Sequence, residues 1–328
     1  MPAVRRRVTA VTAAVSLCAA GLVTGLPAAT SASAAIAPAR AAVAFPGAIN
    51  RSSRSAVLAA YRARYVAPSR VANAWTGSVT GCLAGSESSA YTAATLTAIN
   101  WARAQAGIRP VPGLNATLTS RAQRTALMMQ AQNALSHQTS PSWSCWSAAG
   151  AVGASHSNLA LGVAGARAVA TYLADPGASN TAVGHRRWLL FPRLGTIGIG
   201  NTSRANAVYV LGALRSRVPA GTPAYYAWPT AGYFPRAAEP HGLWSLSSSL
   251  GYSFARATVR VVGPGGRAVR VVRYAPQAGF GDSTLVWRLA TVPSQRVRVD
   301  QSYRVTVSGI RTPSGHSTSY SYVVTLAS

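Results

Sequence analysis

The chain has 328 residues, of which 31 are basic and 5 are acidic, so its formal net charge is +26. With so few carboxylates, an enzyme that needs two acids in one site has little to build from. The basic residues are all arginines and are scattered along the chain, so they form neither the patch nor the module that nucleic-acid binding requires. The charge is explained either by a solvated arginine-rich surface or by attraction to anionic cell-wall polymers or lipid head groups.

Residues 1–34 have the pattern of a secretory signal peptide. Three arginines at positions 5–7 precede an apolar run, and residues 32–34 fit an A-x-A cleavage site. Gly and Pro within the run disfavour a membrane anchor, and the large Leu17 disfavours lipidation at Cys18. No later apolar run is long enough to span a bilayer. We therefore expect a secreted, extracellular protein, with cell-wall association as a further option.

The next feature is a pair of cysteines, Cys82 and Cys145, that remains after the signal peptide. An even pair in an exported protein predicts a disulfide, and two buried free thiols are the alternative. The bond would close a long loop and stabilise the fold by about 4 kcal/mol on the chain-entropy model. A disulfide sulfur offers no thiolate, so neither cysteine is expected to act as a nucleophile.

Composition and periodicity divide the rest of the chain into a lead (35–84), a mixed region (85–215) and a strand-rich region (216–328). The lead contains one expected helix, SAVLAAYRARY. Apolar residues at helical spacing predict three helices in the mixed region, with Ser89 capping the first, Thr117 capping the second and His137 closing it. The three helical segments are SSAYTAATLTAINWARAQAG, NATLTSRAQRTALMMQAQNALSH and GARAVATYLAD. Two further segments, GTIGIGNTS and ANAVYVLGAL, are expected to be strands.

The strand-rich region begins with the Pro-, Gly- and aromatic-rich stretch VPAGTPAYYAWPTAGYFPRAAEP, which suggests a linker or an irregular start. Short alternating runs follow at regular spacing, and GPGG joins two of them as a hairpin. The pattern predicts an antiparallel, immunoglobulin-like sandwich, so the expected fold class is α+β followed by all-β. Asp282 and Asp300 lie beside turns and are expected to be structural.

Several common catalytic motifs are absent from the sequence. There is no G-x-S-x-G elbow, no H-E-x-x-H, and no phosphate-binding glycine loop in a credible strand–helix context. Three histidines of the mixed region remain as candidates: His137, His156 and His185. His137 at a helix end is also explained by the helix dipole alone.

Five pieces of the mixed region resemble, in order, the CAP superfamily, which includes cysteine-rich secretory and plant pathogenesis-related proteins. They are AINWARAQAGIRPV, LNATLTSRAQRTALMMQAQNALSH, SNLALG, YLADPGASNTAVGHRRWLL and GTIGIG. The resemblance covers about residues 88–212. It implies an α-β-α sandwich in which His137 and His185 meet in a central cleft, and in some relatives such a pair binds zinc or another divalent ion.

The chain departs from the family pattern where acids are expected. Many relatives have a G-E-N-[IL] piece whose glutamate faces the cleft, whereas here Ser157 replaces the glutamate and Asn158 keeps the asparagine. Asp175 is the candidate match for a second family acid. Catalytic zinc usually has three protein ligands, and the candidates for the third are His156 and Asp175, with a plain loop residue as the alternative for His156.

In the stretch GHRRWLLFP the resemblance places His185 in the cleft. Arg186 and Arg187 are expected to bond backbone carbonyls or a helix C-terminus, while Trp188 and the two leucines after it continue into the core. Cys145 is expected to tie the loop after His137 back to the lead through Cys82.

Three functions compete at this point. The first is an exported, non-enzymatic CAP binding module for a lipid, glycan, protein or divalent metal, which the scarcity of carboxylates favours. The second is a metal-dependent hydrolase of cell-wall or peptide substrates, with His137 and His185 as ligands and Asp175 as base. The third is an arginine-rich structural or adhesive wall protein, whose binding would fade with salt.

Overall fold

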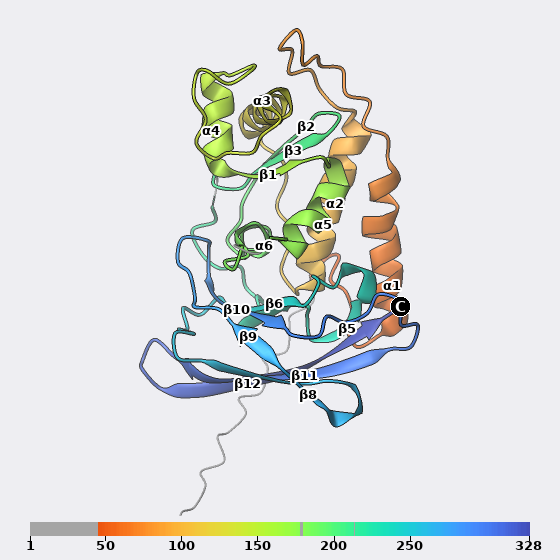
Figure 1. Cartoon of the computed structure of the whole chain (residues 1–328), viewed down its shortest axis with the longest axis vertical. Coiled ribbons are helices and arrows are strands. Elements are labelled where there is room, and N and C mark those ends of the chain that lie inside the picture. The colour runs from red at the N-terminus through yellow and green to blue at the C-terminus, as the bar shows by residue number, and fades with distance from the viewer. Residues whose placement is uncertain (1–44, 178–179, 213) are drawn as a thin grey trace, which may run out of the picture. The chain divides into compact units, whose positions relative to one another are not determined.

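The computed structural model describes residues 45–177, 180–212 and 214–328 (Figure 1). Residues 1–34, for which the sequence predicts a signal peptide, lie outside the described residues, and Cys18 is among them. The described residues all belong to one compact unit. No helix in the described part is both long and apolar enough to cross a membrane.

The expected helix of the lead is present. Helix α1 (Arg54–Tyr61) continues directly into the π-helical turn η1 (Arg62–Val66) and the short 3₁₀ turn η2 (Pro68–Arg70). The side chain of Ser53 caps α1 by accepting the backbone N–H of Ala56.

The mixed region contains five helices among its described residues. The three expected ones are α2 (Ser89–Gln105), α3 (Ala116–Gln132) and α5 (Gly165–Ala174); the other two are α4 (Ala148–His156) and the seven-residue α6 (Gly184–Leu190). Two cap predictions were wrong. The caps are Ser88 and Asn115, because these residues have extended backbones and their side-chain oxygens accept the N–H of the third helical residue. His137 does not close α3, since the helix ends when Asn133 adopts a left-handed conformation at φ 54°.

A three-stranded antiparallel sheet in the order β1-β3-β2 lies between two layers of helices. Its strands are β1 (Ser157–Leu161), β2 (Gly198–Asn201) and β3 (Ala205–Tyr209). Helix α3 packs on β2 and β3 with α4 beside it, while α2 and α5 pack together on the other face (Figure 1). The α-β-α arrangement implied by the resemblance is therefore what these residues form.

The strand-rich region has one four-stranded and one five-stranded sheet, in the orders β4-β6-β10-β9 and β5-β12-β11-β7-β8. The strands are β4 (Tyr225–Trp228), β5 (Gly232–Pro235), β6 (Leu243–Ser248), β7 (Thr258–Val262), β8 (Ala268–Val269), β9 (Val271–Arg273), β10 (Ser283–Leu289), β11 (Gln301–Arg311) and β12 (Ser317–Ala327). The hairpin at GPGG is confirmed as the antiparallel pair β7–β8.

Two expectations for the strand-rich region need correction. Of the two alternatives for the Pro-, Gly- and aromatic-rich stretch, the linker is wrong: the stretch contains β4 and β5, because its aromatic residues pack into the core despite the neighbouring Pro and Gly. The sheets are not wholly antiparallel, since β5 pairs with β12 in parallel.

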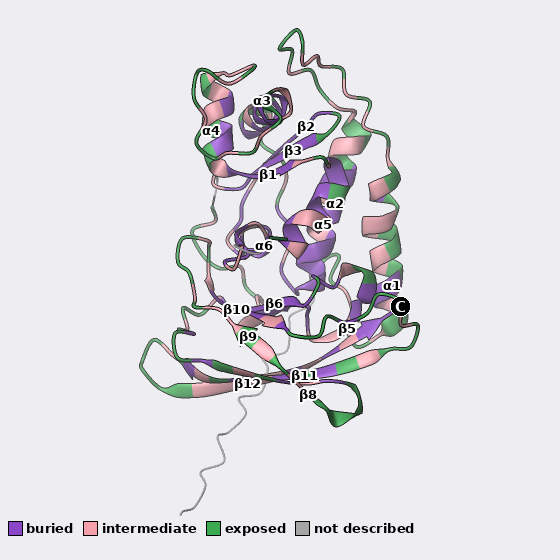
Figure 2. Ribbon diagram, in the orientation of Figure 1, coloured by how far each residue is buried: buried purple, intermediate pink, exposed green. Residues whose placement is uncertain are grey.

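One hydrophobic core runs through both regions, and Figure 2 colours β6 and much of α2 and α5 as buried. Trp101 of α2 meets Trp228 of β4 edge to face, with 6.0 Å between ring centroids. Gln105 donates from Nε2 to the backbone oxygen of Tyr233 at 3.0 Å. The strand-rich region is thus part of the framework on which the helices of the mixed region rest.

Candidate functional site

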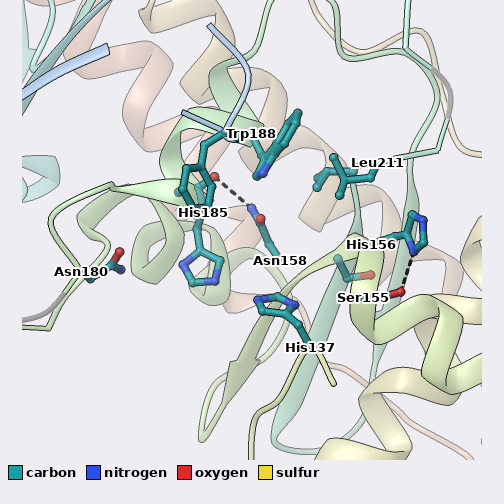
Figure 3. A pocket seen from close by; sticks show the side chains of 13 residues that line it. His137, Ser155, His156, Asn158, Asn180, His185, Trp188 and Leu211 are labelled. Carbon is teal, nitrogen blue, oxygen red and sulfur yellow. Dashed lines mark hydrogen bonds between the residues drawn. The ribbon is translucent and has the colours of Figure 1, made fainter. Parts of the chain in front are cut away.

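A cleft of about 450 Å³ opens where the start of β1, the loop after α5 and the first turn of α6 meet (Figure 3). A loop of the strand-rich region forms part of its wall. The cleft is lined by His137, Ser155, His156, Ser157, Asn158, Asn180, Gly184, His185, Trp188, Val210, Leu211, Gly279 and Phe280. This volume is in the range of small-molecule binding sites.

His185 enters the cleft from the first turn of α6, and a buried carboxylate holds its ring. Its Nδ1 lies 2.8 Å from Oδ1 of Asp175, which has no exposed surface. The same carboxylate accepts a hydrogen bond from Asn180 Nδ2 and a longer one, 3.4 Å, from the backbone N–H of Arg186. A carboxylate only accepts, so Nδ1 carries the proton and Nε2 of a neutral ring is the nitrogen left with a free lone pair.

His137 reaches the cleft from the loop after α3. Its Nδ1 is 2.8 Å from the backbone oxygen of Ala154 in α4. A carbonyl oxygen also only accepts, so this ring too is fixed with Nδ1 protonated and Nε2 free. In Figure 3 the rings of His137 and His185 lie across from each other. The two histidines that the resemblance singled out therefore share one cleft.

The first residues of β1 lie beside this pair. Asn158 donates from Nδ2 to the backbone oxygen of His185 at 3.0 Å, which fixes α6 against the sheet. Ser157 is buried, and its hydroxyl has no hydrogen-bond partner among the described residues. A buried hydroxyl without a partner carries a desolvation cost, and this one stands at the position where the resemblance implies an acid.

The match to a known family covers all the lining residues of this cleft except Gly279 and Phe280. Residues 96–212 match the model of the cysteine-rich secretory protein family, CAP. These residues form a CAP domain. None of the curated proteins is similar enough to this chain to count as a match. Among solved structures, CopC from Methylosinus trichosporium OB3b is similar over 31% of this chain and 88% of its own, with 20% identity and a TM-score of 0.23, a likeness too weak to carry an argument.

His156 also lines the CAP cleft but is held differently. Its Nδ1 is 2.8 Å from both the backbone oxygen of Val152 and Oγ of Ser155, and its ring stacks on Tyr209. In Figure 3 it points away from His137 and His185. Residues 45–177, 180–212 and 214–328 contain no group of three or more His, Cys, Asp and Glu placed to hold a metal ion.

The two arginines after His185 anchor α6, as expected from the sequence. Arg186 is buried and donates to the backbone oxygens of Leu173 and Ala174 at 2.6 and 3.2 Å. Burial lowers the pKa of its guanidinium to about 10, although the charges of Asp175 and Glu239 oppose this effect. Arg186 thus stays protonated at neutral pH, and its positive charge and the carboxylate that holds His185 stabilise each other.

Arg187 joins the CAP domain to the strand-rich region at the edge of the cleft. It donates to the backbone oxygens of Gln277 and Asp282 at 2.8 and 2.9 Å, and its guanidinium lies 5.3 Å from the ring centroid of Phe280. Phe280 packs so closely on Gly184 that a Cβ there would lie 2.7 Å from the phenylalanine ring. A side chain from outside the CAP domain therefore forms one wall of its cleft.

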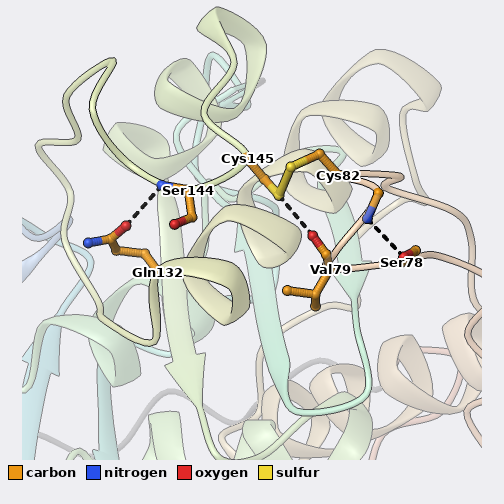
Figure 4. The surroundings of a disulfide bond; sticks show 7 residues. Ser78, Val79, Cys82, Gln132, Ser144 and Cys145 are labelled. Atoms are coloured by element: carbon orange, nitrogen blue, oxygen red, sulfur yellow. Dashed lines mark hydrogen bonds between the residues drawn. A yellow bond between two sulfur atoms is a disulfide. The ribbon is translucent and has the colours of Figure 1, made fainter.

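The predicted disulfide between Cys82 and Cys145 is present, and the Cα atoms of the two residues lie 5.0 Å apart (Figure 4). It ties the loop that follows His137 to the lead. The same loop is held from α3, because Gln132 Oε1 accepts the backbone N–H of Ser144 at 2.9 Å.

Sequence reasoning missed several residues that shape the site. Trp188 was expected in the core but is only half buried and lines the cleft, whereas the two leucines after it are buried. Asn180 and Phe280 carried no motif that could have revealed them. Gly184 stands directly before the candidate histidine, but only the structure shows how closely Phe280 packs on it.

Proposed function

We propose that this chain is an extracellular binding module whose CAP cleft holds a divalent cation between Nε2 of His137 and Nε2 of His185. The observation that carries the proposal is the engagement of both Nδ1 atoms, one by a buried carboxylate and one by a backbone carbonyl. Such partners fix the tautomer and orientation of histidines that bind metals. Imidazole nitrogens suit zinc, copper and nickel better than magnesium or calcium.

The two imidazole nitrogens of His137 and His185 fit a cation that the protein coordinates only in part. Two imidazoles leave further positions open, and a zinc ion bound there would supply a Lewis-acidic centre for an oxygen or nitrogen of a ligand. The protein itself would orient that ligand, through the polar side chain of Asn158 and the apolar walls of Trp188, Leu211 and Phe280.

Binding is better supported than hydrolysis. A hydrolase would need a base that reaches the cleft, and the candidate Asp175 is buried behind His185, with both of its oxygens engaged. Catalytic zinc usually has three protein ligands, and this cleft presents two imidazoles that face each other.

Calorimetric titration of the purified protein with Zn²⁺ tests the proposal. We expect one equivalent to bind, with affinity at least about 100-fold lower in His137→Ala and in His185→Ala, because each variant loses one of two ligands. His316→Ala is the matched control, since His316 is exposed and lies outside the cleft. Absence of saturable binding, or equal affinity in the three variants, would contradict the proposal.

A further inference from the structure

A second cavity of about 550 Å³ lies away from the CAP cleft, between the helix of the lead and the strand-rich region. One wall is α1 with the turns that follow it, and the other is the end of β5, the loop before β11 and the end of β12. The two walls touch, since Arg54 of α1 donates to the backbone oxygen of Ser328 at 2.7 Å. Figure 1 shows α1 beside β5 and the end of the chain marked C.

None of the residues of this groove belongs to the stretch 96–212 that matches the CAP family. Its lining residues are Leu58, Tyr61, Arg62, Val66, Ala67, Arg70, Pro235, Arg236, Ala237, Gln295, Arg298, Ala327 and Ser328. The groove is thus a feature of this chain's own lead and strand-rich region.

The lining combines apolar side chains with basic ones and contains no acidic side chain. Leu58 and Ala327 are buried at its base, and Val66 and Pro235 add further apolar surface. An alkyl group placed there would be removed from water, which is favourable in proportion to the apolar area covered.

Three of the four arginines of the groove are available to a ligand. Arg62, Arg70 and Arg298 are exposed, and their guanidinium groups have no hydrogen-bond or ion-pair partner within the described ranges. The fourth, Arg236, is buried and already donates to backbone oxygens, among them those of Val299 and Leu326.

Arg54 engages the acidic groups at the end of the groove where the two walls touch: it donates to the terminal oxygen of Ser328 and also pairs with Asp300. Arg54 meets Asp300 at 3.0 Å, so this carboxylate does not compete for the free guanidinium groups. Planar guanidinium groups match the geometry of carboxylates and phosphates.

From this arrangement we infer that the groove binds a single-chain anionic amphiphile. Its carboxylate or phosphate head pairs with Arg62, Arg70 and Arg298, and its alkyl chain lies on the apolar base. The ligand enters as a monomer, because the groove is a pocket between two walls rather than a flat surface.

Calorimetry with dodecyl phosphate, below its micelle concentration and at physiological salt, tests the inference. We expect saturable 1:1 binding that is at least about ten-fold weaker in the double variant Arg62→Gln/Arg298→Gln, because charge-assisted hydrogen bonds are lost. The control double variant Arg270→Gln/Arg304→Gln removes the same charge from exposed positions outside the groove, and its affinity should stay within about two-fold of the unchanged protein. His137→Ala should bind like the unchanged protein, which separates this site from the CAP cleft.

Three results would overturn the inference. Equal weakening in both double variants would mean that only net charge attracts the ligand. Equal binding of inorganic phosphate would mean that the apolar base contributes nothing. Binding to vesicles that contain phosphatidylglycerol, without binding of monomeric dodecyl phosphate, would assign the surface to a membrane.

Discussion

Replacing Asp175 with asparagine removes the charge that holds His185 while keeping the shape of the side chain. The carboxylate now accepts from Nδ1 of His185 at 2.8 Å, from Asn180 and from the backbone N–H of Arg186. An asparagine amide has one acceptor oxygen and one NH₂ group. Its oxygen can keep the bonds to His185 and Asn180, which both end on Oδ1, only if its NH₂ group faces the backbone N–H of Arg186, which is itself a donor.

We expect Asp175→Asn to weaken zinc binding about 10- to 100-fold, the usual effect of losing the outer partner of a metal-bound histidine. This range corresponds to about 1.4 to 2.7 kcal/mol of binding free energy. Calorimetric titration with Zn²⁺ measures the change directly. Thermal denaturation followed by circular dichroism shows whether the variant is folded at the temperature of the titration.

Glu239→Gln is the matched control for this experiment. Glu239 is also buried and accepts hydrogen bonds from Gly242 and Trp244, but from neither histidine. Its substitution should leave zinc affinity within about two-fold. A folded Asp175→Asn protein with unchanged zinc affinity would refute the role assigned to the carboxylate.

Three further predictions concern the walls and the stability of the site. Ser157→Glu should raise zinc affinity at least about ten-fold, because it adds a carboxylate ligand to two imidazoles, whereas Ser157→Gln should not; calorimetry of both variants decides. Changing Cys82 and Cys145 together to serine should lower the free energy of unfolding by about 4 kcal/mol on the chain-entropy model. Urea titration measures this free energy, and a decrease of less than about 1 kcal/mol would contradict the prediction. Gly184→Ala should destabilise the protein by about 1 to 3 kcal/mol, as overpacking does; Phe280→Ala should remove most of that cost in a double-mutant cycle, and a cost that persists would show that Phe280 is not the cause.

Helices with a clear apolar stripe could be predicted from the sequence. The spacing of Leu118, Ala122, Thr125 and Met129 predicted α3, and all four residues are buried. Helix α4 was missed, since AAGAVGASH has no such stripe and contains two glycines that disfavour a helix. Those glycines permit close packing, because a Cβ at Gly153 would meet Thr125 and the backbone of α3. The stability of α4 thus comes from a tertiary contact that local patterns do not encode.

The strand β6 was missed for a related reason. All six of its residues are buried, so it lacks the alternation that marks a strand with one solvated face. Its sequence LWSLSS also lacks the β-branched residues found in β2 and β3, which are wholly buried and were predicted. Alternating runs such as β7 and β11 have exposed arginines on one side and were predicted.

The candidate site, like the fold, could be predicted from the sequence only in part. Sequence motifs, through the family resemblance, identified His137 and His185, and the structure brings them into one cleft. The contacts that orient them could not be predicted, because they join distant elements: Ala154 of α4 holds one ring and Asp175 at the end of α5 holds the other. Phe280 is further still along the chain, and only the packing of the strand-rich region places it beside Gly184.

The most direct test of the proposed cation site is a long-range ¹H–¹⁵N NMR spectrum of the histidine rings during titration with Zn²⁺. Without metal, His137 and His185 should both show Nδ1 protonated, as their acceptors require. One equivalent of zinc should then shift the Nε2 resonances of these two rings together and leave those of His156, His241 and His316 in place. Zinc shifts at Nδ1, or at other histidines in place of this pair, would contradict the account.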